Sequence, residues 1–208
     1  MPINLCLIGA GGHGKVVFDV LNDPLYNQER CSIFYTDEDP EKKFALNMDV
    51  ISQENALELA THFHVCIGDN KCRERLANLF ELNKIKPWVI CSPRSIVSQA
   101  SIISAGAFIA PGSVIAHGAN VGAYAIVNHL AVVDHGCSIG PYTHIAPGSI
   151  VCGDVNIGNR VLVGAGSVIL PGLSIGSDAI IGAGSRVTEN IESGMVWIGD
   201  GRGRHKNV

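Results

Sequence analysis

The sequence predicts a small Rossmann-like α/β domain over residues 1–90, a parallel β-helix over residues 91–194 and a C-terminal tail over residues 195–208. Three observations support this prediction. An aliphatic residue recurs at every sixth position in the second half, many of the 24 glycines stand beside it, and the chain opens with a strand, a glycine loop and a helix. The six-residue pattern begins near residues 87–93, where helical patterning ends.

The six-residue repeat is the strongest signal. Every sixth residue from Val121 to Val187 is Val or Ile, and glycine often follows directly. A period of six matches no helical face, and each glycine would destabilise a helix interior by about 1 kcal/mol. Short parallel strands joined by tight corners fit the pattern, with three hexapeptides in each triangular coil. Residues eighteen apart should therefore lie one above another.

An earlier part of the repeat has a different phase. Ile96, Ile102, Phe108 and Val114 also follow a six-residue spacing, but one extra residue precedes Val121. This shift predicts a bulge at one corner of the β-helix. It also predicts that the histidines at 117 and 135 do not stack, although they are eighteen residues apart.

The first ninety residues predict a small, open, parallel sheet. A buried strand, INLCLIG, leads into Gly9–Gly14, which matches GxGxxG, and an amphipathic helix follows. A second strand over residues 32–35 is followed by Asp37, about where a ribose-binding acid stands. A later strand over residues 63–67 leads into Gly68 and another helix, which gives the order βαβ(α)βαβ.

The glycine loop allows two interpretations. It is either a tight turn that packs a helix on a strand, or a phosphate site at the amides of a helix N-terminus. Only half of the usual doubly wound sheet is present, so a mononucleotide or a nucleotide-linked sugar fits better than a full dinucleotide.

Composition excludes several partners. Charged residues make up 16% of the chain and the net charge is −4, so no basic field favours nucleic acid. Seven cysteines without a CxxC pair, and without a secretory leader, predict reduced thiols in a cytoplasmic protein. No apolar run approaches the roughly 18 residues of a membrane helix, so we expect no membrane insertion.

Four histidines fall within the repeat, and His135 is the best candidate for a general base. It lies in Val-Asp-His-Gly-Cys on the outer wall of a coil, where a neighbouring subunit could meet it. Imidazole titrates near neutral pH and can remove a proton from an attacking amine or hydroxyl. Asp134 could orient the ring, although neighbouring strand residues face opposite ways. His144 follows nine residues later, so the two histidines meet only if a second chain lies alongside.

Two other chemistries remain open. Zinc needs about three converging imidazoles, and the phase shift separates His117 from His135, so we expect no metal. Cys137 and Cys152 are possible covalent nucleophiles, but Cys137 occupies a small inward position of the repeat.

Three motifs resemble the sugar acetyltransferase family that includes the bacillosamine-pathway N-acetyltransferase, perosamine N-acetyltransferase and sialic acid O-acetyltransferase. They are IGAGGHGK, NHLAVVDHGCSIGPYTHIAPGSIVCGDVNIG and VGAGSVILPGLSIGSDAIIGAGSRVTENI. The resemblance covers nearly the whole chain. It implies a left-handed β-helix, a handedness that the repeat alone does not give, and a homotrimer with acetyl-CoA bound between neighbouring helices.

The resemblance also implies roles for individual residues. It places the catalytic base at His135 and a contact with the acetyl thioester at His144. Backbone positions along the pantetheine fall at Ala165, Gly182 and Ala183. The nucleotide-sugar site falls at Gly12, His13, Gly14, Asp37 and Gly68.

The chain departs from the family pattern at two places. The family usually has an acid directly after the catalytic histidine, whereas Gly136 stands here. The base therefore is weaker, uses Asp134 or has lost its catalytic role. The family's closing G-x-P-A-[KR] turn is replaced by Ile-Gly-Asp-Gly-Arg-Gly-Arg, although Arg202 and Arg204 remain for coenzyme phosphates.

These features predict an acetyl-CoA-dependent N-acetyltransferase acting on a nucleotide-linked amino sugar, with direct attack on the thioester. O-acetylation of a sialic-acid-like sugar is the alternative with the same donor and base. A catalytically silent scaffold or regulatory subunit of a sugar pathway is the non-enzymatic alternative, which Gly136 favours.

Overall fold

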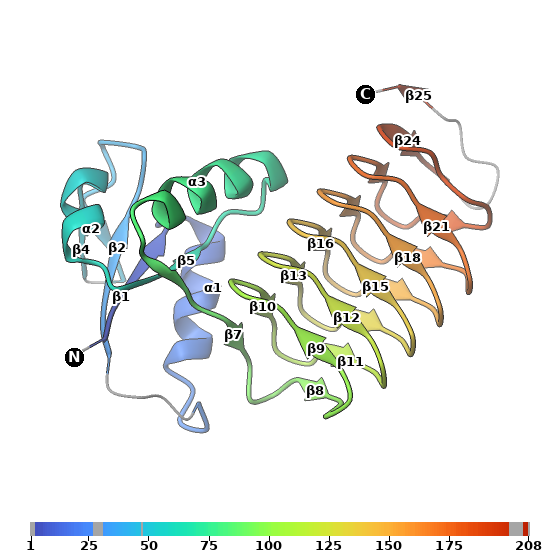
Figure 1. Cartoon of the computed structure of the whole chain (residues 1–208), viewed down its shortest axis with the longest axis horizontal. Coiled ribbons are helices and arrows are strands. Elements are labelled where there is room, and N and C mark those ends of the chain that lie inside the picture. Colours follow the sequence, from blue (N-terminus) through green and yellow to red (C-terminus); the bar gives the residue numbers. More distant parts are fainter. Residues whose placement is uncertain (1–2, 27–30, 47, 200–205, 208) are drawn as a thin grey trace.

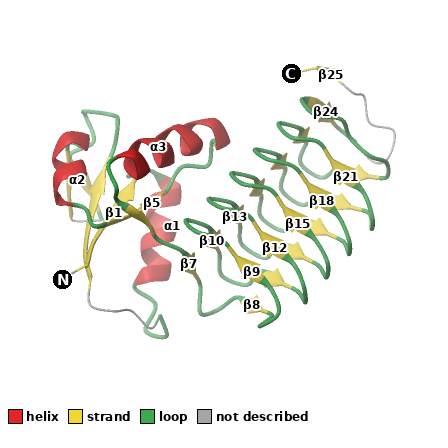
Figure 2. Cartoon of the chain, in the orientation of Figure 1, coloured by secondary structure: helices red, strands yellow, loops and turns green. Residues whose placement is uncertain are grey.

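The computed structural model describes residues 3–26, 31–46, 48–199 and 206–207. An α/β domain with helices around a sheet lies beside a stack of triangular coils (Figures 1 and 2). The sheet has the order β3-β4-β2-β1-β5-β6, parallel except for the β3–β4 pair. Its elements are β1 (Ile3–Ile8), α1 (Gly12–Leu21), β2 (Cys31–Thr36), β3 (Phe44–Ala45), β4 (Met48–Ile51), α2 (Gln53–Leu59), β5 (His62–Val65), α3 (Asn70–Leu82) and β6 (Lys86–Pro87).

The predicted parallel sheet is confirmed, with two additions. The β3–β4 hairpin and the short helix α2 fill the stretch between the second and third predicted strands. Helix α1 buries Gly14, Val17, Val20 and Leu21, as expected for the predicted amphipathic helix. Ser52 caps α2 and Asp69 caps α3 by accepting backbone N–H hydrogen bonds, so both helix starts are set by local sequence.

The second part of the chain is a parallel β-helix with three faces. The first face contains β7 (Ile90–Cys91), β10 (Phe108–Ile109), β13 (Ile126–Val127), β16 (His144–Ile145), β19 (Leu162–Val163), β22 (Ile180–Ile181), β24 (Met195–Trp197) and the antiparallel β25 (Lys206–Asn207). The second contains β8 (Ile96–Val97), β11 (Val114–Ile115), β14 (Val132–Val133), β17 (Ile150–Val151), β20 (Val168–Ile169) and β23 (Arg186–Val187). The third contains β9 (Ile102–Ile103), β12 (Asn120–Val121), β15 (Ser138–Ile139), β18 (Asn156–Ile157) and β21 (Ser174–Ile175).

The predicted bulge before Val121 is wrong. Strand pairing stays in steps of eighteen, and the inward position is the second residue of each strand: Val97 pairs with Ile115, and Ile103 pairs with Val121. The inward residues therefore follow one uninterrupted six-residue repeat. Ile96, Ile102 and Val114 point outward, and they merely happen to be aliphatic as well. His117 and His135 consequently share one corner column, and the carbonyl of His117 accepts the Gly136 N–H.

Each corner contains one residue in the left-handed backbone region. We call the corners first (first to second face), second (second to third face) and third (third to first face). The left-handed residues recur every six positions and are mostly glycine, because glycine adopts a positive φ without strain. They are Gly106, Gly112, Gly118, Tyr124, Leu130, Gly136, Tyr142, Gly148, Asp154, Arg160, Gly166, Gly172, Asp178 and Gly184.

Helix α3 fixes the α/β domain to the third corner. The buried guanidinium of Arg73 donates to the carbonyl oxygens of Tyr124 and Tyr142 at 2.8 and 2.6 Å. Arg160 pairs with Glu74 of α3 as well as with Asp178. These contacts hold the glycine loop of the α/β domain beside the first face of the β-helix.

The outward residues of the three faces differ in character. Those of the second face are aliphatic in five consecutive coils, and Ile96 is 68% exposed. This apolar column contains Ile96, Val114, Val132, Ile150 and Val168. In the described ranges, no helix has the length and apolar character needed to cross a membrane.

Candidate active site

Histidines from both domains gather where the glycine loop meets the first face. His13 lies in the first turn of α1, His64 lies in β5, and His144 begins β16. The His13 ring packs edge-on against Phe108 at 5.1 Å, and the His64 ring lies 6.0 Å from Phe108. This interdomain cluster joins residues that are far apart in the sequence.

His144 is held by two partners that fix its tautomer. Its Nε2 lies 3.1 Å from the side-chain amide nitrogen of Asn128, which is a donor. Its Nδ1 therefore carries the hydrogen and donates to the Gly68 carbonyl oxygen at 3.3 Å. Burial and the nearby Arg73 charge lower the pKa of His144 to about 4, against the opposing effect of the Gly68 carbonyl. His144 is thus neutral at pH 7.

His13 and His64 are buried and neutral as well. Burial is the main reason why the pKa of His13 falls to about 3, with contributions from His64, His144 and Arg73. Burial likewise lowers the pKa of His64 to about 4, although its Nδ1 bonds the Trp88 carbonyl at 2.8 Å. The Nε2 atoms of both rings are buried without a hydrogen-bond partner. Both rings are therefore uncharged and keep an unused hydrogen-bonding position inside the protein.

The glycines of the loop have different tasks. Gly9 has a φ of +109°, and a β-carbon at Gly14 would lie 2.1 Å from the Gly9 carbonyl oxygen. These two positions therefore set the turn and its close packing. A β-carbon at Gly11 or Gly12 would meet no atom within 4 Å, so the loop is open there to a ligand. Helix α1 also has no side-chain cap, which leaves its first amides available.

Asp37 stabilises the glycine loop by a hydrogen bond to its backbone. Its Oδ2 accepts the Ala10 N–H at 2.7 Å and pairs with Lys42 at 3.0 Å. Burial alone would raise the pKa of Asp37, but hydrogen bonds from the Asp39 and Ala10 amides and from Lys42 outweigh it and lower the pKa. Little of the carboxylate is left for a ribose hydroxyl. A pocket of about 400 Å³ beside it is lined partly by Lys42 and Lys43.

His135 lies at the second corner, away from the interdomain cluster. Its side chain is 62% exposed, and its Nδ1 lies 4.0 Å from the carboxylate of Asp154 in the following coil. The Asp134 carboxylate instead accepts the backbone N–H of His135 at 2.7 Å. Within one chain, therefore, His135 lies near Asp154 at the second corner, while His144 lies on the first face.

The expected coenzyme residues line up along the first corner. Ala165 and Ala183 are exposed and stand one above the other, with Gly182 beside them. A β-carbon at Gly148, Gly166 or Gly184 would meet no atom within 4 Å, so small residues leave an open ledge of backbone. This ledge begins beside His144 and fits an extended chain such as pantetheine. Arg202 and Arg204 lie outside the described residues.

The structure thus gathers some candidates and separates others. Gly68, His13 and His144 meet in the interdomain cluster, and Gly12 and Gly14 belong to the loop that borders it. The sequence did not single out Arg73, Asn128, His64 or Asp154. Arg73 is buried on the same face of α3 as Leu76 and Phe80, and its helical spacing from these apolar residues was the available signal in the sequence.

Neither alternative chemistry gains support from the local geometry. The Cys137 thiol is buried and donates to the Cys152 carbonyl oxygen at 3.0 Å, and burial raises the pKa of both thiols. Raised thiol pKa values reduce the reactive thiolate. Across the described part of the chain, no group of three or more His, Cys, Asp or Glu side chains is placed to hold a metal ion.

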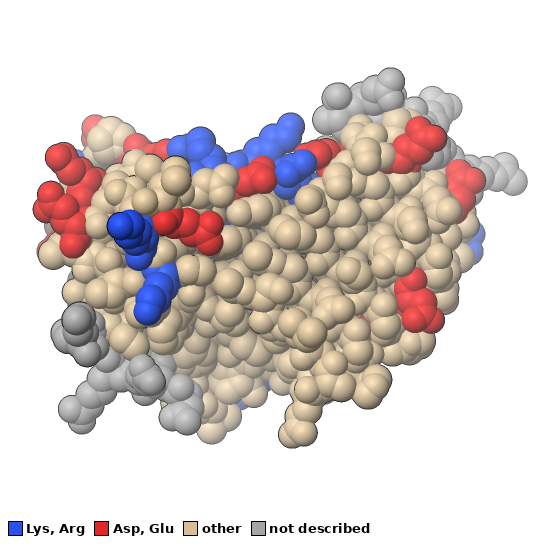
Figure 3. Space-filling view, in the orientation of Figure 1, with Lys and Arg blue, Asp and Glu red and all other residues tan. Residues whose placement is uncertain are grey.

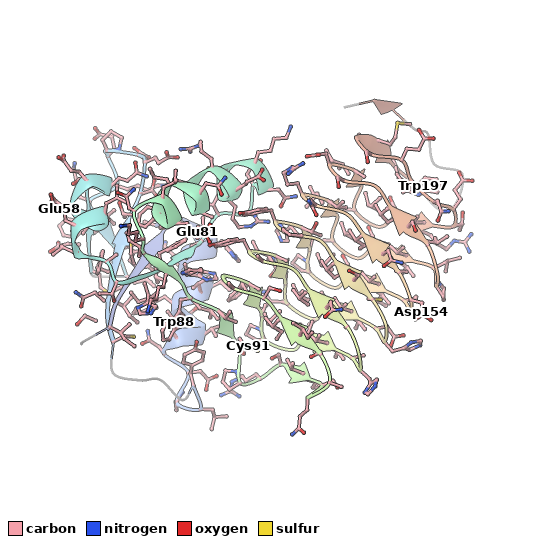
Figure 4. The ribbon with its side chains drawn as sticks, in the orientation of Figure 1. Glu58, Glu81, Trp88, Cys91, Asp154 and Trp197 are labelled. Atoms are coloured by element: carbon pink, nitrogen blue, oxygen red, sulfur yellow. The ribbon has the colours of Figure 1, made fainter. Side chains whose placement is uncertain are left out.

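Charged residues are unevenly distributed over the surface. In Figure 3 they gather over the α/β domain and along one edge of the β-helix, while most of the remaining face is uncharged. Figure 4 shows Asp154 at the edge of the β-helix away from α3. The candidate base is therefore on a corner that the α/β domain of its own chain leaves uncovered.

Two families match this chain. Residues 4–80 match the PglD N-terminal domain, and residues 154–189 match the bacterial transferase hexapeptide of six repeats. GDP-perosamine N-acetyltransferase from Escherichia coli O157:H7 is 30% identical over 59% of this chain and 58% of its own length. UDP-N-acetylbacillosamine N-acetyltransferase from Bacillus subtilis (strain 168) is 30% identical over 51% of this chain and 50% of its own length. The matched segments thus span only about half of each of these relatives.

Several solved structures match nearly the whole chain, and one of them illustrates the similarity. It is a variant of perosamine N-acetyltransferase from Caulobacter crescentus in complex with CoA and GDP-perosamine. The TM-score is 0.90 at 29% identity, and the match covers 99% of this chain and 97% of that one. These similarities confirm the predicted fold class, a Rossmann-like domain followed by a left-handed parallel β-helix.

Proposed function

We propose that this chain, which pairs a PglD-type N-terminal domain with a hexapeptide-repeat β-helix, transfers the acetyl group of acetyl-CoA to the amine of a nucleotide-linked amino sugar. The observation that carries the proposal is the open glycine loop beside His13 and His144, next to the unobstructed ledge of the first corner. One feature suits a nucleotide and the other suits an extended thioester donor. The similar perosamine N-acetyltransferase structure is a complex with CoA and GDP-perosamine.

The nucleotide sugar would bind against the α/β domain. Its diphosphate would meet the amides at the start of α1, where Gly11 and Gly12 leave room for it. Asp37 would act indirectly, because its carboxylate already holds the Ala10 amide. The neutral rings of His13 and His64 would lie behind the sugar end of the site, and a sugar hydroxyl would reach their buried Nε2 atoms only after neighbouring side chains move.

Acetyl-CoA would lie along the first corner over Ala165, Gly182 and Ala183. The ledge contains no large side chain, so backbone N–H and C=O groups would contact the pantetheine. The acetyl end would reach His144. Since the His144 ring donates from Nδ1 to Gly68, its neutral state is fixed by the protein and it would act as a polar contact and not as a base.

His135 would act as the general base. The amine nitrogen attacks the thioester carbonyl carbon while the imidazole takes its proton, and the C–S bond then breaks. The leaving thiolate takes that proton, so the products are an N-acetylated sugar and the CoA thiol. No covalent acetyl-enzyme is needed, in line with the buried Cys137.

The complete site would form between subunits of a homotrimer. His135 lies on the second corner and the ledge lies on the first, and the apolar second face separates them. Packing that face against a second copy would bury Ile96, Val132 and Ile150 and bring His135 of one chain to the ledge of another. Exposed aliphatic columns of this kind are typical of subunit contacts.

Thiol release from acetyl-CoA tests the proposal. Purified protein would be mixed with nucleotide-linked 4-amino sugars, free amino sugars and sialic acids, and the product would be checked for one added acetyl group by mass spectrometry. We expect turnover with the nucleotide-linked amines. Turnover with sialic acids alone would assign the alternative O-acetyltransferase, and silence with every acceptor would favour a scaffold.

Mixing two inactive variants tests the subunit arrangement. His135→Ala and His144→Ala would each be slow alone. If the site spans two chains, mixed oligomers regain activity at the interfaces that contain one intact copy of each histidine. A mixture that stays as slow as its components would contradict a shared site.

A further inference from the structure

At the second corner, two successive coils each place one side chain over a glycine of the other coil. His135 and Gly136 stand in one coil, and Gly153 and Asp154 stand eighteen residues later in the next. A β-carbon at Gly153 would lie 2.5 Å from the His135 ring. A β-carbon at Gly136 would lie 2.2 Å from Oδ1 of Asp154. Each glycine thus makes the space that the other coil's side chain occupies.

We propose that Asp154 is the carboxylate that positions the His135 imidazole for proton abstraction. The inference rests on the function proposed above. Asp154 Oδ1 lies 4.0 Å from His135 Nδ1, and both side chains are mostly exposed, at 72% and 62%. A small side-chain rotation closes this to a hydrogen bond, and such contacts commonly tighten only when substrate binds. Held this way, Nδ1 carries the hydrogen and Nε2 is left free to take the proton.

The backbone of Asp154 supports a functional reason for an acid at this position. In the same corner column the left-handed residues are Gly118, Gly136, Asp154 and Gly172, so three of the four are glycine. Asp154 has a φ of +59°, which an L-residue adopts less readily than glycine. The backbone of this corner therefore does not itself require an acidic side chain at position 154.

Other titratable groups near the ring do not take the same place. One carboxylate oxygen of Asp134 already accepts a hydrogen bond from the backbone N–H of His135. His117 belongs to the preceding coil of the column, where its carbonyl accepts the Gly136 N–H. The thiols of Cys137 and Cys152 stay protonated because burial raises their pKa. Asp154 is left as the carboxylate that faces the ring.

Activity across pH tests the proposal with two substitutions and one control. Asp154→Asn removes the charge, and Asp154→Gly removes the side chain while matching the backbone preference of the column. For both we expect kcat to fall about tenfold and the acidic limb of the pH–rate profile to shift by about half a pH unit to lower pH, with KM for acetyl-CoA within twofold. Glu192→Gln, an exposed acid in the last coil, should leave the profile unchanged.

The unfolding temperature distinguishes a role of Asp154 in positioning His135 from a role in holding the fold together. Asp154→Gly should unfold at the same or a higher temperature than the wild type, since glycine relieves the positive φ, and it should still lose activity. A wild-type profile in both Asp154 variants of an active enzyme overturns the proposal and leaves the acetyltransferase function standing.

NMR keeps the test independent of the acceptor. In the full chain, the ring ¹⁵N chemical shifts of His135 should show hydrogen on Nδ1 in the wild type and a larger share of the Nε2–H form in Asp154→Gly. An unchanged ratio of the two forms overturns the proposal. If the wild type turns over no acceptor, the proposed function fails while the NMR result still decides whether Asp154 interacts with His135.

Discussion

Nε of Arg73 in α3 donates to the carbonyl oxygen of Tyr124 in the β-helix at 2.8 Å. The same guanidinium donates to Ile67 and Gly68 in its own domain and to Tyr142 in the next coil. Although burial lowers its pKa to about 10, Arg73 keeps its charge at pH 7. One buried side chain therefore links the glycine-loop domain, the Gly68 partner of His144 and two coils of the β-helix.

Replacing Arg73 should destabilise the protein strongly. Arg73→Met leaves several buried carbonyl oxygens without a donor, so we expect a loss of about 3 kcal/mol in the free energy of unfolding. Arg75→Ala is the matched control on the same helix, because its pair with Glu38 is on the surface, and it should change stability by less than about 1 kcal/mol. Urea unfolding of both variants measures the difference. Equal effects would show that the buried contacts do not hold the domains together.

Stability should fall as the pH drops below 6.5. The folded-state pKa values of His13, His64 and His144 lie near 3 to 4, whereas unfolded histidine titrates near 6.5. The unfolded chain therefore binds more protons between about pH 6.5 and pH 4. Each histidine should remove about 1 kcal/mol of stability at pH 5.5 relative to pH 7.5.

The His64→Gln variant isolates one member of this set. Its free energy of unfolding should change less between pH 7.5 and pH 5.5 than that of the wild type, because one buried titrating group is gone. Chemical unfolding at the two pH values gives both slopes. An equal slope in the variant would mean that the His64 ring does not stay neutral in the folded protein.

The ledge of the first corner can be blocked without touching the core. Ala165 is exposed, so Ala165→Trp should leave the unfolding temperature nearly unchanged while its ring covers the backbone beside Gly182. We expect KM for acetyl-CoA to rise at least tenfold, with KM for the sugar within twofold. Steady-state kinetics with each substrate varied provides both values, and an unaltered KM for acetyl-CoA would place the donor elsewhere.

The six-residue repeat was enough to predict the β-helix, because inward aliphatic residues and corner glycines are local requirements of each coil. Its phase was harder to assign. Ile96, Ile102 and Val114 are outward residues from two different faces, and with Phe108 they resembled an inward series, so the predicted bulge and the separation of His117 from His135 were wrong. A column of aliphatic residues on the surface and a column in the core produce the same pattern in the sequence.

The candidate site was only partly predictable. The sequence and the family resemblance pointed to His135, His144 and the glycine loop, because these stand in recognisable motifs. They did not predict that Gly68 and Asn128 fix the His144 ring, since these partners lie 76 and 16 residues away. The proximity of Asp154 to His135 depends on how the side chains of the second corner turn toward the following coil, and the repeat alone does not give that orientation.

The most direct test of the account is the rate of thiol release from acetyl-CoA with a nucleotide-linked 4-amino sugar, compared between the wild type and His135→Gln. Loss of a general base should lower kcat by roughly 10²- to 10⁴-fold while the variant stays folded and oligomeric. A His135→Gln enzyme that turns over as fast as the wild type would contradict the assignment of His135 as the base.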